Sequence, residues 1–446
     1  MKNHFKYLMF LATVFTFSIG MVSCGNDDDD PTPAKTEEQE KNDAIKSLVG
    51  AYLDNVVYPT YTNLANESEV LYTLINNLKN KLKEGNTVSQ SEIDAICDAY
   101  KEARAYWEES EAFLFGAASD FNIDPHMDTW PLDLPTLAKD LKDDAKIAAL
   151  DSENGIEWAR SQGNLTPENL GFHGIEFIFF RDGKNRSSNF FNNNDVEDDS
   201  SFSGLDVTSL DEVKFAAAIA GDLRDKCYQL EVCWLGSKAA ASHVSRVAEC
   251  TNHNAEDFAT KVEKSGMSYG ENMLAAGTSV STYSNWRQVI EEILVGGCSN
   301  ICAEVADQKM GQAYRAATGK AEYHEDEESG EMVLDDPNYI ESPYSYNSFT
   351  DFKGNILSIQ YSLYGKARSN QVSSTSIMAY LKKYGPEIAE ELDKRLQKAL
   401  DAIDVCLNSG KAFVQDPGAQ VVGDAMDAIA ELDSYLNTTS NWVLTK

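Results

Sequence analysis

The spacing of apolar residues constrains the fold of this chain more than any other feature, because it keeps a helical period over long stretches. Apolar positions recur at i, i+3, i+4 and i+7, which places them on one face of an α-helix. The first such stripe consists of Ile45, Leu48, Val49, Tyr52, Leu53 and Val56. Similar stripes run over residues 70–82 and 388–403, and residues 91–116 form a further predicted helix. Strand-like alternation is scarce and only eleven prolines interrupt the chain, so we predict an all-α fold.

Two segments interrupt the helical pattern and indicate how the chain is divided. Residues 181–206 are rich in Asn, Asp and Ser, and residues 321–346 are rich in acids, Pro and Tyr. We interpret the first segment as the joint between two domains, since the chain on each side of it has the length of an ordinary domain. The prediction is two tandem helical bundles, each like a four-helix bundle, over residues 44–200 and 201–446.

The first 23 residues have the layout of a bacterial secretory signal. Lys2 and Lys6 precede an apolar run over residues 7–19, which is too short to cross a hydrocarbon core of about 30 Å as a helix. The run leads to Met21-Val22-Ser23-Cys24-Gly25, which has the form of a lipobox. We therefore predict that residues 1–23 are removed and that Cys24 is lipidated and anchors the protein in a membrane. The alternative is an ordinary signal peptide with an incidental cysteine.

Residues 24–43 are polar and acidic, with no large apolar side chain that could nucleate a core. We predict that they form a flexible tether. The acidic run directly behind Cys24 resembles the surface-export signal of some Gram-negative lipoproteins, which implies an outer-membrane lipoprotein displayed on the outer leaflet. A plain solvated spacer is the alternative.

The chain is strongly acidic, with a formal net charge of −34 that becomes −36 once residues 1–23, which hold two lysines and no acid, are removed. Such a field attracts cations and repels nucleic acid and anionic headgroups, and no basic patch is present, so we expect no nucleic-acid partner. Seven cysteines remain besides Cys24, and none forms a C-x-x-C pair. We expect most of them to be buried helix residues, with one or two disulfides as the alternative.

The strongest chemical candidate is Gly171-Phe172-His173-Gly174-Ile175-Glu176. Thr166-Pro167 can start a helix here, so His173 and Glu176, three residues apart, share one face. An imidazole and a carboxylate at this spacing can converge on one metal ion, with iron favoured and zinc as the alternative. Gly171 and Gly174 would let another backbone approach closely. The plain alternative is a buried His hydrogen-bonded to a Glu, and a metal would need further acids from elsewhere.

Two further clusters contain polar groups that could line such a site. Glu111 lies on the apolar stripe of the predicted helix 91–116, where an unpaired acid is costly, and Trp130-Pro131-Leu132-Asp133 follows it. The third cluster contains Ser342, Ser345, Asn347 and Asp351. Helix capping is the alternative explanation for Asp133 and for this third cluster.

Together the three clusters resemble the imelysin family, whose Gly-x-His-x-x-Glu signature is matched by Gly171, His173 and Glu176. Further matches, in the family's order, are Trp107-x-x-Ser110-Glu111-x-Phe113-x-Phe115-Gly116, Trp130-Pro131-x-Asp133 and Glu341-Ser342-x-x-Ser345-x-Asn347-Ser348-x-x-Asp351-x-x-x-Asn355. The resemblance implies two bundles packed side by side, with the motif helix near their junction. It also implies an exported protein associated with iron uptake, in a family of which some members were described as peptidases. The residues it implies near the site, besides His173 and Glu176, are Glu111, Trp130, Asp133, Ser342 and Ser345.

Three functional hypotheses follow. In the first, a lipid-anchored envelope protein of iron acquisition uses His173, Glu176 and Glu111 to hold a divalent or ferric ion, or an iron-containing ligand, for an envelope transport partner. In the second, His173 and Glu176 form a metallopeptidase site, although one His with scattered acids is a poor hydrolytic zinc site. In the third, the chain is a non-enzymatic interaction module that binds another surface protein or a haem-like ligand, which predicts an exposed aromatic patch over residues 339–364.

Overall fold

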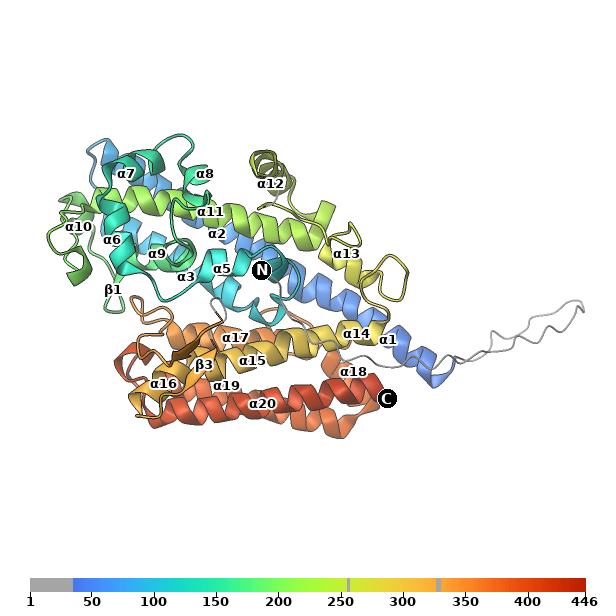
Figure 1. The fold of residues 1–446 in the computed structure, drawn as a ribbon. Coiled ribbons are helices and arrows are strands. Elements are labelled where there is room, and N and C mark those ends of the chain that lie inside the picture. Colours follow the sequence, from blue (N-terminus) through green and yellow to red (C-terminus); the bar gives the residue numbers. More distant parts are fainter. Residues whose placement is uncertain (1–34, 255–256, 326–329) are drawn as a thin grey trace, which may run out of the picture.

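The computed structural model describes residues 35–254, 257–325 and 330–446. Helices dominate these ranges, and the strands within them form only two short antiparallel hairpins, so the predicted all-α fold is confirmed. Figure 1 shows two layers of helices packed side by side. The predicted signal peptide, the lipobox and Cys24 lie outside the described residues. Within the described ranges no helix combines the length and the apolarity needed to cross a membrane.

Four helices form the core of the first bundle, the upper layer in Figure 1. They are α2 (Tyr58–Lys83), α3 (Gln90–Glu108), α9 (Gly171–Phe179) and α11 (Ser209–Leu235). Helix α11 packs along α2, and the short helix α9 contacts both α3 and α11. Almost every side chain of α11 is buried, because neighbouring elements surround it on several sides.

Short helices cover this bundle and connect its members. The α-helices are α4 (Ala117–Asp120), α5 (Ile123–Asp128), α6 (Leu134–Lys142), α7 (Asp144–Leu150), α8 (Gly155–Arg160), α10 (Ser188–Asn192), α12 (Ala241–His253) and α13 (Tyr269–Leu274). The 3₁₀ turns are η2 (Glu111–Phe113), η3 (Pro167–Asn169), η4 (Ser200–Phe202) and η5 (Gly236–Lys238). The hairpin of β1 (Phe180–Arg181) and β2 (Lys184–Asn185) directly follows α9.

The second bundle, the lower layer in Figure 1, contains three regular helices and one interrupted helix. The regular helices are α17 (Ser348–Tyr364), α19 (Pro386–Leu407) and α20 (Gln420–Thr445). The fourth alternates between α and π geometry as α14 (Trp286–Glu291), η6 (Glu292–Ser299), α15 (Asn300–Ala303) and η7 (Glu304–Lys309). Smaller elements are α16 (Gly311–Ala317), β3 (Tyr323–Glu325), β4 (Met332–Leu334), α18 (Ile377–Tyr384) and η8 (Phe413–Gln415). The π-helical turns are wider than α turns and are often found at functional sites.

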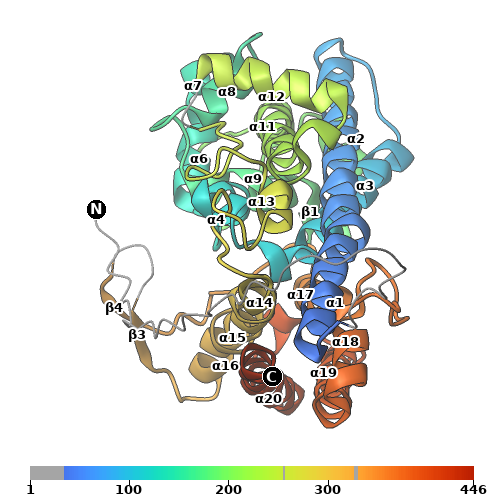
Figure 2. The ribbon, with the colours of Figure 1, turned by 90° about the vertical axis from the view of Figure 1, so that its right-hand side faces the viewer.

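The two bundles are joined by shared helices and by close backbone packing. Helix α1 (Glu37–Tyr52) continues through the π segment η1 (Leu53–Val57) into α2, and this long helix crosses both layers (Figure 2). Helix α17 of the second bundle packs against α3 of the first. A Cβ atom on Gly354 would lie only 2.7 Å from the Cβ atom of Glu108, so glycine permits this close contact. Glu108 is thereby fixed at the junction of the bundles.

Two predicted boundaries differ from the structure at the ends of helices. The predicted tether 24–43 does not extend through residues 37–43, which are helical, because Thr36 and Gln39 form a capping box at the start of α1. The predicted helix 91–116 ends at Glu108. There the Ser110 hydroxyl donates to the Trp107 carbonyl and the Ala112 N–H donates to Ser358 Oγ of α17, so tertiary partners replace the helical hydrogen bonds.

The expected division between residues 200 and 201 does not coincide with the packing of the bundles. Helix α11 follows that point in the chain, yet it packs on α2 and α9 and so completes the first bundle. The segment 181–206, interpreted as a joint, instead contains the β1–β2 turn, α10 and η4, and α10 contacts α11. The reason is that the apolar faces of α2 and α9 need a further long helix to cover them.

Candidate metal centre

The motif helix α9 is brought against the end of α5 by its glycines. A Cβ atom on Gly171 would lie 1.9 Å from the carbonyl oxygen of Met127, and Gly171 has a φ of 61° that favours glycine. A Cβ atom on Gly174 would lie 2.4 Å from the carbonyl oxygen of Asn169. The predicted close approach of another backbone is confirmed at Gly171, whereas the close backbone atom at Gly174 belongs to the residue five positions earlier in the chain. The contact at Gly171 places His173 next to Asp128, the last residue of α5.

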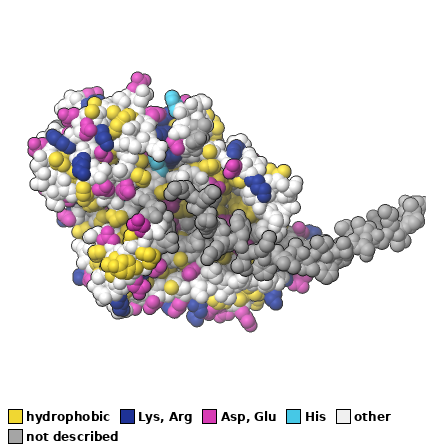
Figure 3. Space-filling view, viewed as in Figure 1, with side chains coloured by type: hydrophobic (Ala, Val, Ile, Leu, Met, Phe, Trp, Pro, Cys, Tyr) yellow, Lys and Arg dark blue, Asp and Glu magenta, His cyan; other side chains and the backbone are white. Residues whose placement is uncertain are grey.

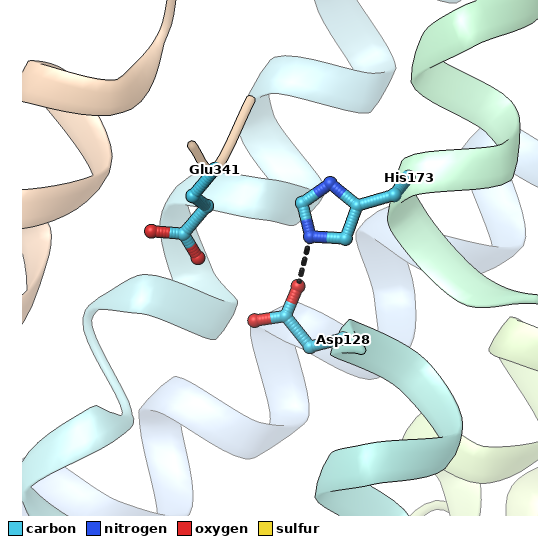
Figure 4. Close-up of side chains that lie close together, drawn as sticks. All are labelled: Asp128, His173 and Glu341. Atoms are coloured by element: carbon cyan, nitrogen blue, oxygen red, sulfur yellow. Dashed lines mark ion pairs between the residues drawn. The ribbon is translucent and has the colours of Figure 1, made fainter. Parts of the chain in front are cut away.

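His173 and Asp128 form a buried ion pair. The distance from His173 Nε2 to Asp128 Oδ1 is 3.0 Å (Figure 4). On the other side of the ring, His173 Nδ1 lies 3.7 Å from Glu176 Oε2. Burial by itself lowers the pKa of His173, but the adjoining carboxylates of Asp128 and Glu176 outweigh burial and raise it to about 9. His173 is therefore an imidazolium at neutral pH in the ion-free protein.

Arg104 of α3 forms ion pairs with several acids at once. Its Nη2 atom lies 2.6 Å from Glu341 Oε1 and 2.7 Å from Glu108 Oε1, while Nη1 pairs with Asp128. Trp107, one turn further along α3, donates from Nε1 to Asp128 Oδ2 at 2.7 Å. Although burial opposes ionisation, Arg104 and His173 hold the pKa of Asp128 well below its usual range. Asp128 therefore carries its charge throughout the physiological pH range.

Lys309, the last residue of η7, is the third buried cation of this site. Its Nζ atom lies 3.2 Å from Glu341, 3.7 Å from Glu111 and 3.9 Å from Glu108. The same ammonium sits 4.9 Å from the centroid of the Trp130 ring, within the range of a cation–π contact. Burial lowers the pKa of Lys309, but these acids outweigh burial and raise it well above its usual value.

We call the buried charged residues of this region the junction cluster. Its members are Arg104, Glu108, Glu111, Asp128, His173, Glu176, Lys309, Glu341 and Asp351. All nine side chains are buried, and six are acids whereas only three are bases. Burial raises the pKa of Glu108 and Glu111 well above the usual value and that of Asp351 to about 7, so protons offset part of the surplus negative charge.

Glu176, a predicted metal ligand, is held by a loop of the second bundle. Its Oε1 atom accepts hydrogen bonds from the Tyr344 N–H at 3.1 Å, the Ser345 N–H at 2.8 Å and the Ser345 hydroxyl at 2.7 Å. These three bonds fix the loop that follows Glu341. The structure thus places Ser345 beside the motif, as expected, and gives Glu176 a role in positioning the loop.

The other predicted residues fall into two groups. Glu111 and Trp130 both face Lys309, so they belong to the site region. Asp133 instead caps α6 by accepting from the Thr136 N–H at 3.0 Å, which is the alternative explanation considered for it.

Ser342 and Asn347 act on the site through Asp351. The Ser342 hydroxyl and the Asn347 amide each donate to a different oxygen of Asp351 at 2.5 Å. Asp351 in turn lies 3.5 Å from Arg104 Nε. Ser342 has a φ of 50°, a left-handed conformation that is costly for a residue other than glycine. The loop is therefore held in this conformation by the contacts that surround it.

Sequence reasoning assigned no site role to five members of the junction cluster, namely Arg104, Glu108, Asp128, Lys309 and Glu341, although Glu341 is the first residue of the third family pattern. A local signal existed for two of them, because Arg104 and Glu108 are an i, i+4 ion pair on the apolar face of α3 that also carries Trp107. Asp128, Lys309 and Glu341 carry no such signal, since their partners lie on other elements.

The donor set of the junction cluster fits a metal ion in its chemistry. Ligand atoms of Asp128, His173 and Glu341 lie within 4.8 Å of one another, and an imidazole with two carboxylates suits iron or zinc. Two overlapping groups of acids meet the same criterion, namely Glu108 with Glu341 and Asp351, and Glu108 with Glu111 and Asp128. Glu341 Oε2 is buried and lacks a hydrogen-bond partner among the described residues. Because the same carboxylates bind the internal cations, a metal ion would bind in exchange for protons or for one of these cations.

The geometry gives the peptidase hypothesis little support. His173 is the one histidine in the candidate metal-binding groups of the described ranges. His173 and Glu176 are both almost completely buried, so a polypeptide substrate cannot reach them in this conformation.

The exposed aromatic patch predicted over residues 339–364 is not present, because the tyrosines of this segment are buried or half-buried. A group of exposed apolar side chains lies instead on the neighbouring β3–β4 hairpin, where Tyr323 is 68% exposed, Met332 62% and Leu334 49%. Tyr323 and Leu334 are register partners in this hairpin. Figure 3 shows an apolar patch with acidic side chains around it in this region.

Comparisons of sequence and structure with known proteins identify several that are similar to this chain. The sequence profile of the family described as Imelysin matches residues 57–436. A protein named Iron-regulated protein A from Synechococcus elongatus is 23% identical over 389 residues, covering 87% of this chain and 83% of that protein. A crystal structure of a protein provisionally described as an iron-regulated protein A precursor, from Parabacteroides distasonis, has a TM-score of 0.68 at 23% identity. The match covers 92% of this chain and 96% of that one.

Proposed function

The chain belongs to the imelysin family, and from this premise we propose that it is a lipid-anchored envelope protein that binds a metal ion, iron favoured, in the junction cluster and serves iron acquisition. The observation that carries the proposal is the surplus of buried carboxylates over buried bases in this cluster. Burying unpaired acids is costly, so such a surplus is retained where a cation is to be bound. The name of the Synechococcus relative supports iron as the ion.

Asp128, His173 and Glu341 would hold the ion, with Glu108 and Asp351 beside them. The ion is cargo in this proposal, and the chain's own residues bind and release it. Asp128 carries the permanent negative charge, whereas His173 must give up its proton before its nitrogen can act as a ligand. Arg104 keeps Asp128, Glu108 and Glu341 together whether or not an ion is present.

The cellular setting is part of the proposal. Lipidation at Cys24 would tether the domain to the outer membrane, with a polar segment before α1 as spacer. In this setting the bound ion would pass to a separate envelope transport partner. The acidic surface favours the approach of cations to such a domain.

An anaerobic titration with Fe²⁺ tests the proposal on the mature chain without its lipid. We expect one ion per chain for the wild type and at least a tenfold weaker affinity for His173→Ala and for Asp128→Asn. His253→Ala is the matched control, because His253 is an exposed histidine at the end of α12. If the wild type and both site variants bind Fe²⁺ equally weakly, with no stoichiometric site, the proposal fails.

A further inference from the structure

We propose that Lys309 is a built-in cation that occupies the junction cluster in the ion-free protein and moves out when a metal ion binds. Lys309 thereby restricts the site to ions that coordinate carboxylates strongly. This inference rests on the proposed function and concerns the regulation of the same site.

The first observation is that Lys309 is held by charge rather than by close hydrogen bonds. Its Nζ atom makes one hydrogen bond within the cluster, to Glu341 at 3.2 Å, and the carboxylates of Glu111, Glu304 and Glu108 lie at 3.7, 3.8 and 3.9 Å. Arg104, by contrast, contacts Glu341 at 2.6 Å and Glu108 at 2.7 Å. An ammonium on a flexible stem is also easier to move than a guanidinium fork. Between Arg104 and Lys309, Lys309 is the cation that can be exchanged.

The second observation is a partly exposed acid next to Lys309. Glu304 and Lys309 are the first and last residues of the π-helical segment η7, and their side-chain charges lie 3.8 Å apart. The Glu304 side chain is 42% exposed, whereas the cluster acids that face Lys309 are buried. Lys309 can therefore shift towards Glu304 and water while its charge stays paired. A π-helical turn is a rare geometry that offers room for such a rearrangement at its end.

The consequence concerns which ions the site retains. An incoming ion must replace an ammonium that is tethered to the site and therefore present at a high effective concentration. Mg²⁺ keeps most of its water, and Mn²⁺ binds most weakly among the first-row divalent ions, whereas Fe²⁺ binds nitrogen and oxygen donors more strongly. Lys309 should thus lower the affinity of every ion by about the same factor, so that only ions with a strong intrinsic affinity, such as iron, stay bound at low concentration.

The first test compares Lys309→Met with the wild type in the mature chain. Methionine keeps an unbranched stem beside Trp130 and removes the charge. We expect Mn²⁺, measured by electron paramagnetic resonance, to bind the variant at least tenfold more tightly than the wild type, and Fe²⁺ to gain by a similar factor. Lys353→Met is the matched control, because Lys353 of α17 pairs with Asp404 of α19, outside the junction cluster. This variant should leave both affinities unchanged. A folded Lys309→Met protein with unchanged or weaker Mn²⁺ affinity would overturn the inference.

A second measurement needs no variant and decides the matter if Lys309→Met does not fold. Acetic anhydride acylates exposed lysines, so saturating the wild type with Fe²⁺ should increase acylation of Lys309 severalfold, read by mass spectrometry with Lys353 as internal reference. Acylation that stays constant or falls while Fe²⁺ is stoichiometrically bound would overturn the role of Lys309 and leave the proposed function intact. Absence of stoichiometric Fe²⁺ in both wild type and variant would overturn the proposed function together with this inference.

Discussion

His173 Nε2 lies 3.0 Å from Asp128 Oδ1, so the histidine of the Gly-x-His-x-x-Glu motif is paired with an acid from outside the motif. Asp128 also binds Arg104 and accepts from Trp107, which ties the motif helix α9 to α3 and α5. Glu176 at the other end of the motif is bound to the loop of the second bundle. The motif thus connects the two bundles and positions the acids between them.

The first prediction concerns the pH dependence of stability in the ion-free protein. The pKa of His173 is about 9 in the folded chain and near 6.5 in an unfolded chain. The contribution of His173 to the free energy of unfolding is therefore fully present below about pH 6.5. It is lost as the pH rises through 9, and the total is roughly 3 kcal/mol. Urea denaturation from pH 6 to 10 in the presence of a chelator should show this decline in the wild type. His173→Gln should lack most of it, and an identical decline in both proteins would contradict the assignment.

The second prediction concerns Glu176, whose Oε1 atom accepts three hydrogen bonds from Tyr344 and Ser345. Glu176→Gln removes the charge that strengthens these bonds and should lower the free energy of unfolding by about 2 to 4 kcal/mol. Stoichiometric Fe²⁺ binding should survive under conditions where the variant is folded. Loss of the ion with unchanged stability, measured by urea denaturation and Fe²⁺ titration side by side, would show instead that Glu176 is a ligand.

The third prediction compares two glycines that both have positive φ. Gly171→Ala would place a Cβ atom 1.9 Å from the Met127 carbonyl oxygen and should destabilise the protein by more than about 3 kcal/mol. Gly163 has a φ of 83°, and a Cβ atom there would meet nothing within 4 Å, so Gly163→Ala carries only the backbone strain, about 1 to 2 kcal/mol. Thermal denaturation of both variants checks this order. Equal losses would argue against the tight contact between α9 and α5.

The fourth prediction concerns the cysteines. The seven cysteines between Cys97 and Cys406 are free and buried, which agrees with the expectation of buried helix residues. Burial raises the pKa of Cys97 and of Cys227 to about 12, so little reactive thiolate forms at neutral pH. A chain that lacks Cys24 should therefore react negligibly with a thiol reagent when folded and yield seven thiols in guanidinium without reductant. A yield at least two thiols below the expected seven would reveal a disulfide.

Much of the local structure could be predicted because it depends on neighbours in the chain. The stripe from Ile45 to Val56 is helical, and the helix over residues 388–403 starts at Pro386 as its position suggests. Gly171 and Gly174 indicated a close backbone approach because they lack a side chain, and the contact with another element exists at Gly171. The end of α3 was missed because Ser358, far along the chain, supplies a hydrogen bond that replaces a helical one.

The sequence by itself determined that helices form, that His173 and Glu176 share a buried face, and that an excess of acid must be accommodated. Only the tertiary structure decided which charges meet. Arg104 and Glu341 are 237 residues apart in the chain, and Lys309 reaches the same carboxylate from a third element. The physical reason is that helical period depends on spacing over a few residues, whereas ion pairs depend on the distance between atoms that only the packing of two bundles brings together.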